Sequence, residues 1–147
     1  MKVSVLSSGS KGNSVYVETN NHKILMDIGN SCLYIEKALH ELEIDPKEID
    51  IVLITHAHKD HIAGLNIFSK KYNPLIYITR AIEEEAKLNL NNKIYFDGEI
   101  VLDTLKITPI KTSHDVDDSY GYILEEDNNS LVYITDTGYI HKRYFDI

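Results

Sequence analysis

Cysteine, basic charge and long apolar runs are all scarce in this chain of 147 residues. The single cysteine, Cys32, excludes an intrachain disulfide and gives no sign of an oxidising compartment. Lysine and arginine total 15 against 23 aspartates and glutamates, and the net charge of −8 argues against a broad basic surface for phosphate backbones. The longest apolar runs, such as residues 51–54, are of strand length, so the sequence shows neither a signal peptide nor a membrane span. We expect a cytoplasmic protein with no membrane partner.

The overall composition is that of a folded domain. Hydrophobic residues make up 43% and charged residues 26%, which is close to the globular average and argues against disorder. The length fits one domain, which we place at residues 1–147. Histidine is the exception to this ordinary composition, because three of the seven histidines lie within residues 56–61. Metal binding is therefore the first function to consider.

Apolar stretches separated by turn residues predict a mixed α/β (α+β) chain that begins with a β-meander. Strands are expected at residues 3–6, 15–17, 23–27, 51–54, 75–79, 93–96, 100–102, 105–110, 120–125 and 131–135. Helices are expected at residues 34–42, 63–71 and 80–88. Residues 45–48 have an acidic N-cap, a proline at the first helical position and a glutamate three residues after the cap, which predicts a capped turn.

Four metal-ligand side chains follow directly on the buried strand at residues 51–54. They are His56, His58, Asp60 and His61. Alternate residues of an extended chain point the same way, so His56 and His58 can face one side, and a turn can bring the other two beside them. Imidazole and carboxylate ligands suit zinc, manganese or iron, whereas the lack of neighbouring thiolates argues against a cysteine-type structural zinc site. The alternative, a solvated polar loop, does not account for this spacing.

Further ligands are expected downstream, because one loop cannot complete two coordination spheres. His114 and Asp136 both follow predicted strands, as the histidine cluster does. A surface histidine is the alternative for His114. For Asp136 the alternative is an N-cap of a helix that begins near Tyr139. The cluster upstream favours metal binding for both residues.

The order and spacing of these motifs resemble the metallo-β-lactamase superfamily over essentially the whole chain. The His-x-His-x-Asp-His motif of that family matches residues 56–61, and its later metal histidine and bridging aspartate match His114 and Asp136. Asp27, in the segment Leu-Met-Asp-Ile-Gly, matches an aspartate that supports the metal loop. The resemblance implies two divalent ions, zinc or manganese. One would be held by His56, His58 and His114, the second by Asp60 and His61, with Asp136 bridging both.

The small-residue loop at 7–14, the segments 113–115 and 120–122, and residues 134–138 resemble the YycJ/WalJ-like branch of this superfamily. Members of that branch are regarded as metal-dependent phosphodiesterases or nucleases, so the resemblance implies a phosphodiester or nucleic-acid substrate. Asp60 would both bind metal and move a proton to the leaving oxygen. A thioester or lactone hydrolase of the same superfamily is one alternative. A catalytically impaired fragment that acts as a binding module is the other.

Two lysines remain open to two interpretations. Lys11 and the backbone N–H groups of residues 7–14 could approach a phosphate, or the loop could be a plain tight turn. Lys59 lies inside the metal motif and could equally be a solvent-facing charge.

The resemblance also implies an αββα sandwich, of which the chain covers the first αβ half and the start of the second. The domain is thus expected to be incomplete at its C-terminal end. The family completes its second metal site with a later histidine, and His141 comes too early to match it, so the second site is expected to be weakened. An αβ half alone leaves one apolar sheet face open to water. We expect a fragment or a short form that covers this face as a homodimer.

Overall fold

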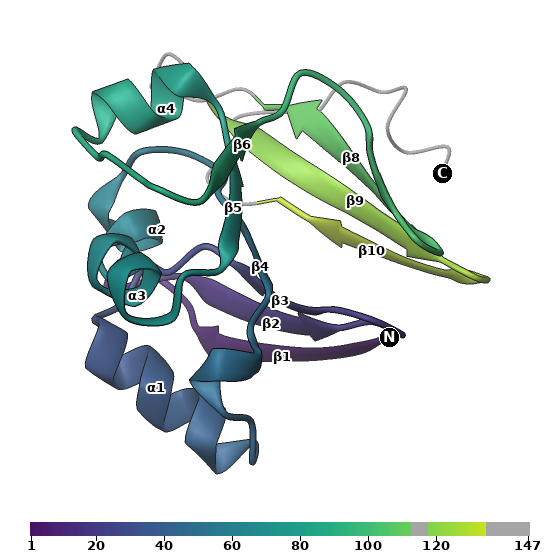
Figure 1. Cartoon of the computed structure of the whole chain (residues 1–147), viewed down its shortest axis with the longest axis horizontal. Coiled ribbons are helices and arrows are strands. Elements are labelled where there is room, and N and C mark those ends of the chain that lie inside the picture. Colours follow the sequence, from purple (N-terminus) through teal and green to yellow (C-terminus); the bar gives the residue numbers. More distant parts are fainter. Residues whose placement is uncertain (113–117, 135–147) are drawn as a thin grey trace.

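The computed structural model describes residues 1–112 and 118–134 of the chain. Two β-sheets pack face to face, and helices cover the other face of the larger sheet (Figure 1). The larger sheet consists of β1 (Lys2–Ser7), β2 (Ser14–Glu18), β3 (Lys23–Met26), β4 (Ile51–Leu53), β5 (Leu75–Ile78) and β6 (Lys93–Tyr95). The smaller consists of β7 (Ile100–Leu102), β8 (Leu105–Lys111), β9 (Tyr120–Glu126) and β10 (Asn129–Tyr133). The helices are α1 (Cys32–Glu41), η1 (Pro46–Glu48), α2 (Lys59–Ile62), α3 (Leu65–Tyr72) and α4 (Arg80–Glu85).

The larger sheet has the strand order β1-β2-β3-β4-β5-β6. Its first three strands form the predicted antiparallel meander, and β3 to β6 are parallel. All three residues of β4 are buried because the strand is covered on both faces, which explains its uninterrupted apolar sequence. Since parallel strands end at the same edge, the segments after β3, β4, β5 and β6 gather there, where ligand sites of α/β sheets lie.

The helices follow their predicted positions and pack on one face of this sheet. Ile35 and Leu39 of α1 and Phe68 of α3 are fully buried in the core beneath them. Ser31 caps α1 by accepting a hydrogen bond from the backbone N–H of Tyr34. The predicted capping box at residues 45–48 is also present. One helix was not predicted: α2 is a single turn inside the metal motif, too short to show a helical period.

The smaller sheet, ordered β10-β9-β8-β7, covers the second face of the larger one. Met26 and Leu53 from the larger sheet share a core with Leu105, Tyr122 and Leu124 from the smaller. The expectation that a face of the first αβ half lies open to water is therefore wrong, because strands β7 to β10 already bury it.

The outer face of the smaller sheet is of mixed character. Val101, Lys106, Glu125 and Ser130 are paired across neighbouring strands on that face. Lys106 forms ion pairs with Glu99 and Glu125, so polar groups interrupt the exposed apolar side chains. Within the described ranges, no helix is long and apolar enough to cross a bilayer.

Candidate metal centre

The segment that carries the candidate ligands begins where β4 ends, and both sheets hold it. The Ile54 carbonyl accepts a hydrogen bond from the Tyr122 hydroxyl at 2.5 Å, and the Thr55 carbonyl accepts one from the Tyr120 backbone N–H at 2.8 Å. Burial raises the pKa of Tyr122 well above its ordinary value, so its hydroxyl stays protonated and donates. The start of the metal loop is thus fixed by β9 of the smaller sheet.

Three of the predicted ligands come together at this edge. Ligand atoms of His56, His58 and Asp60 all lie within 4.8 Å of one another. His56 is fully buried, whereas the other two are half-buried, so the group opens toward solvent on one side. The chain is extended through His58 and then turns into α2, which brings Asp60 back beside the histidines. The expectation that His56 and His58 face one side agrees with this grouping.

Hydrogen bonding determines which nitrogen of His56 carries the lone pair. The Thr55 hydroxyl donates to Asp27 Oδ2 at 2.8 Å and lies 2.9 Å from His56 Nδ1. Because the single hydroxyl proton goes to the carboxylate, the hydroxyl oxygen accepts from His56 Nδ1–H. The lone pair of His56 is therefore on Nε2, the nitrogen that can bind a metal.

His61 is oriented by the same carboxylate. Its Nδ1 lies 2.6 Å from Asp27 Oδ2, and both side chains are fully buried. Donation from Nδ1–H leaves the lone pair on Nε2, which lies 3.6 Å from Asp60 Oδ2. Asp27 itself has a positive φ of 63°, a left-handed conformation that aspartate tolerates better than most residues. These contacts agree with the supporting role that the family resemblance implies for Asp27.

Asn13 is a residue of this region that sequence reasoning missed. Its backbone N–H donates to the Asp60 carbonyl at 2.7 Å, and its side-chain amide donates to Asp60 Oδ2 at 3.2 Å. The same amide lies 3.3 Å from His61 Nε2. The small-residue loop at 7–14 is thus packed against the metal loop through Asn13. Lys11 and Lys59 are both exposed to solvent.

Gly29 permits this contact between the two loops. A Cβ atom at position 29 would lie 1.8 Å from the Asp60 carbonyl oxygen and 2.5 Å from the Asn13 backbone nitrogen. Neither backbone atom can move aside easily, so only glycine fits. The Asp-Ile-Gly segment could be recognised in the sequence because of Asp27. No local pattern, however, indicated that Gly29 lies against the backbone of Asn13 and Asp60.

His114 and Asp136 lie outside the described residues. The residues that flank 113–117 are held together: Lys111 Nζ lies 2.6 Å from Asp118 Oδ1, and the Thr112 and Ser119 hydroxyls are 2.8 Å apart. Asp118 also accepts a hydrogen bond of 2.5 Å from the Thr79 hydroxyl after β5. The predicted pair of metal sites, with His114 completing the first and Asp136 bridging it to a second formed by Asp60 and His61, stays a prediction.

Two curated relatives are similar to almost the whole chain. Exodeoxyribonuclease WalJ of Streptococcus pneumoniae is 35% identical over 97% of this chain and 56% of its own length. Exodeoxyribonuclease YycJ of Bacillus anthracis is 32% identical over 95% of this chain and 56% of its own length. The chain therefore spans about half the length of these relatives. These similarities confirm the resemblance to the YycJ/WalJ-like branch.

Solved structures confirm the fold, and a family comparison confirms the superfamily. The metallo-β-lactamase fold protein YhfI from Bacillus subtilis superposes with a TM-score of 0.72 at 20% identity, over 88% of this chain and 60% of that one. A metallo-β-lactamase variant from Cronobacter sakazakii gives a TM-score of 0.77 at 20% identity, over 98% and 67%. The family pattern described as "Metallo-beta-lactamase superfamily" matches residues 8–141. With the fold, the His-x-His-x-Asp-His motif and this match in agreement, the chain belongs to the metallo-β-lactamase superfamily.

Proposed function

We propose that this chain carries the metal centre of a hydrolase that cleaves phosphodiester bonds in DNA. The observation that carries the proposal is the grouping of His56, His58 and Asp60 at the end of β4. The names of the two similar exodeoxyribonucleases favour DNA over the other substrates of the superfamily.

The donor set fits a divalent metal. Two imidazoles and a carboxylate are ligands of zinc and manganese, and the hydrogen bonds of Thr55 and Asp27 place the lone pairs of His56 and His61 on Nε2. Bound divalent ions activate water and take up charge that develops on phosphoryl oxygens, so the chain needs no serine or cysteine nucleophile. We assign the first metal to His56, His58 and His114, and a weaker second one to Asp60 and His61, with Asp136 between them.

The residues of this chain orient the ligands and move a proton. Asp27 and Thr55 hold the two imidazoles in fixed tautomers, and Asn13 holds Asp60 from the other side. The Asp60 side chain is 27% exposed, so a substrate can reach it from solvent. We assign Asp60 the transfer of a proton to the leaving oxygen, in addition to metal binding.

Activity of the reloaded protein tests the proposal. The chain is stripped with a chelator, reloaded with Zn²⁺ or Mn²⁺, and given end-labelled DNA, a chromogenic phosphodiester, a thioester and a lactone. We expect metal-dependent cleavage of DNA and of the phosphodiester. Cleavage of the thioester or lactone alone would replace the proposal with the other hydrolase class. Metal binding without turnover of any substrate would favour the binding module.

A homodimer remains a prediction with a changed basis. Because the inner face is buried, the outer face of β7 to β10 becomes the candidate surface for a second copy, and its apolar side chains include Val101 and Val132, which are 64% and 46% exposed. Sedimentation of the purified chain decides the question: a monomer at micromolar concentration contradicts the dimer.

A further inference from the structure

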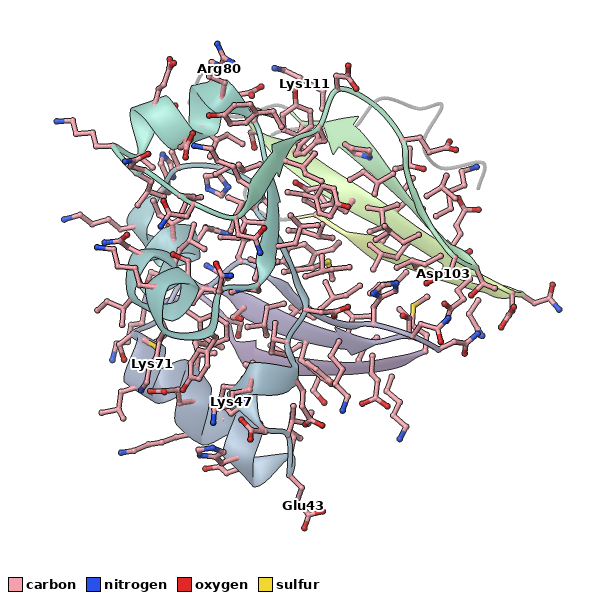
Figure 2. All side chains as sticks on the ribbon, in the orientation of Figure 1. Glu43, Lys47, Lys71, Arg80, Asp103 and Lys111 are labelled. Carbon is pink, nitrogen blue, oxygen red and sulfur yellow. The ribbon has the colours of Figure 1, made fainter. Side chains whose placement is uncertain are left out.

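A small pocket lies beside the metal loop, at the same edge of the larger sheet. It has a volume of about 230 Å³ and is lined by Phe96, Asp97, Gly98, Pro109, Lys111 and Tyr120. These residues follow β6 or belong to β8 and β9, and Lys111 marks this end of the molecule at the top of Figure 2. Pockets for drug-sized ligands have volumes of roughly 300–1,000 Å³, so this one suits a single ring system.

Two aromatic rings form the wall of the pocket. Phe96 and Tyr120 meet edge to face, with their ring centroids 5.1 Å apart and their planes at 85°. Phe96 also contacts the buried ring of Tyr122, with centroids 5.9 Å apart. Because this packing fixes the rings before any ligand arrives, little conformational entropy is lost when a planar partner binds.

The charges around the pocket favour a base over a bare phosphate. Lys111 Nζ lies 5.2 Å from the centroid of the Tyr120 ring and pairs with Asp118 at 2.6 Å. The hydrogen bond that Lys111 donates to Asp118 raises the pKa of Lys111, so the side chain stays cationic, yet the carboxylate offsets its charge. The exposed carboxylate of Asp97 adds negative charge and can accept hydrogen bonds from the amino groups of a base.

The pocket is joined to the metal loop by one hydrogen bond. The backbone N–H of Tyr120 donates to the carbonyl of Thr55 at 2.8 Å, and Thr55 directly precedes His56. The backbone of Tyr120, a wall of the pocket, is therefore in direct contact with the start of the metal loop.

We infer that this pocket binds one unpaired nucleobase of a DNA strand, on the walls of Phe96 and Tyr120. The inference rests on the proposed function and adds a substrate subsite to it. Base stacking on aromatic side chains tolerates any sequence and requires a base that is free of its neighbours, so a single strand or a frayed end is the form that binds. Stacking also suits a chain with a net charge of −8, whose surface offers phosphates little attraction.

Photocrosslinking locates the bound base directly. The full chain is kept metal-free with a chelator, so that the DNA stays intact, and is mixed with a single-stranded oligonucleotide that carries 5-iodouracil. Irradiation and peptide mass spectrometry identify the crosslinked residue. We expect Phe96 or Tyr120. A crosslink confined to an exposed aromatic residue elsewhere, such as Tyr34 on α1, overturns the subsite.

Affinity measurements with matched variants test the same point. Tyr120→Leu removes the ring, and we expect it to weaken binding of the oligonucleotide about tenfold. Tyr120→Phe keeps the ring and should bind within twofold of the unaltered chain, and Tyr34→Leu controls for loss of a ring at a distant exposed site. Thermal melting of each variant separates lost binding from lost folding. If Tyr120→Leu does not fold, Lys111→Gln gives a second test, because it removes the cation beside the Tyr120 ring. Lys106→Gln, on the same strand, is its control.

The outcomes separate the subsite from the activity. Unchanged affinity of Tyr120→Leu and Lys111→Gln, in a chain that still cleaves DNA, overturns the subsite and leaves the proposed function standing. A chain that neither binds nor cleaves DNA overturns both. Weaker binding that Tyr120→Phe restores supports the subsite.

Discussion

The Nδ1 atom of His61 lies 2.6 Å from Asp27 Oδ2, and neither side chain is exposed to solvent. The same carboxylate accepts hydrogen bonds from the backbone N–H and the hydroxyl of Thr55. One buried aspartate thus orients Thr55, which directly precedes the metal motif, and His61 at its end, although it lies 28 residues before Thr55 in the chain.

Asp27→Asn should weaken metal binding and stability together. An amide offers hydrogen atoms where Thr55 and His61 already donate, so at least one buried donor loses its acceptor. We expect a loss of about 1–3 kcal/mol in the free energy of unfolding. We also expect metal affinity to fall by about 10- to 100-fold, the usual effect of removing the hydrogen-bond partner of a metal-binding histidine. Urea unfolding and a zinc titration measure the two effects. Thr55→Ser, which keeps the hydroxyl, is the control, and full metal affinity in Asp27→Asn contradicts the assigned role.

Asp60→Asn and His58→Ala should each abolish metal-dependent turnover. We expect a fall in the hydrolysis rate of a chromogenic phosphodiester by about 100-fold or more, because the proton donor or a metal ligand is lost. Elemental analysis should show less bound metal in His58→Ala. Lys59→Gln changes the exposed residue between them and should leave both readouts unchanged. Turnover that survives in either variant would contradict the assignment of Asp60 and His58 to the metal centre.

Metal occupancy should be unequal. The site of His56, His58 and His114 should hold its ion more tightly than the neighbouring site, for which the sequence offers no matching later histidine. Titration of the metal-free chain with Zn²⁺ should therefore give one tight and one weak binding step. Two tightly held ions per chain in elemental analysis would contradict this prediction.

Gly29→Ala should destabilise the fold by about 3 kcal/mol or more, because overpacking against backbone cannot relax. The added Cβ would lie 1.8 Å from the Asp60 carbonyl oxygen. Gly98→Ala is the matched control, since nothing lies within 4 Å of a Cβ at that position. Denaturant midpoints of the two variants give the comparison, and equal midpoints would show that the two loops do not approach each other in this way.

Acid should remove the contribution of Glu36 to stability. The hydrogen bond from Lys71, at 2.6 Å, and a second from Tyr72 hold the pKa of Glu36 below its usual value of 4.5. A depressed folded-state pKa means that the stabilisation is present above the unfolded pKa and is lost as the pH falls through the folded one. From about pH 6 down to about pH 3, the unaltered chain should therefore lose more stability than Glu36→Gln. Glu41→Gln, at the exposed end of the same helix, should follow the unaltered chain in urea unfolding.

Local patterns predicted the elements and the core of the site. The apolar run of β4 and the spacing of His56, His58 and Asp60 are short-range features, so both could be recognised without a structure. Helix α1 was predicted for the same reason, because its hydrophobic residues repeat at helical spacing within ten residues.

Contacts between distant segments could not be predicted in this way. Asn13 and Asp60 are 47 residues apart, and neither residue type indicates its partner. The strands of the smaller sheet were predicted individually, but periodicity does not tell which surface a strand covers, so the inner face of the larger sheet was wrongly expected to be open. His114 and Asp136 lie outside the described residues and stay predictions.

The hydrogen bond from Tyr122 to the Ile54 carbonyl spans 68 residues of chain. Contacts of such separation form slowly, because a long loop must close before they add stability. We therefore expect the ligand loop to reach its final arrangement only after β9 has docked beside β4, and the metal to bind late in folding. Once captured, an ion binds only the assembled state and raises its stability by mass action. Metal affinity in this chain thus measures how completely its two sheets have come together.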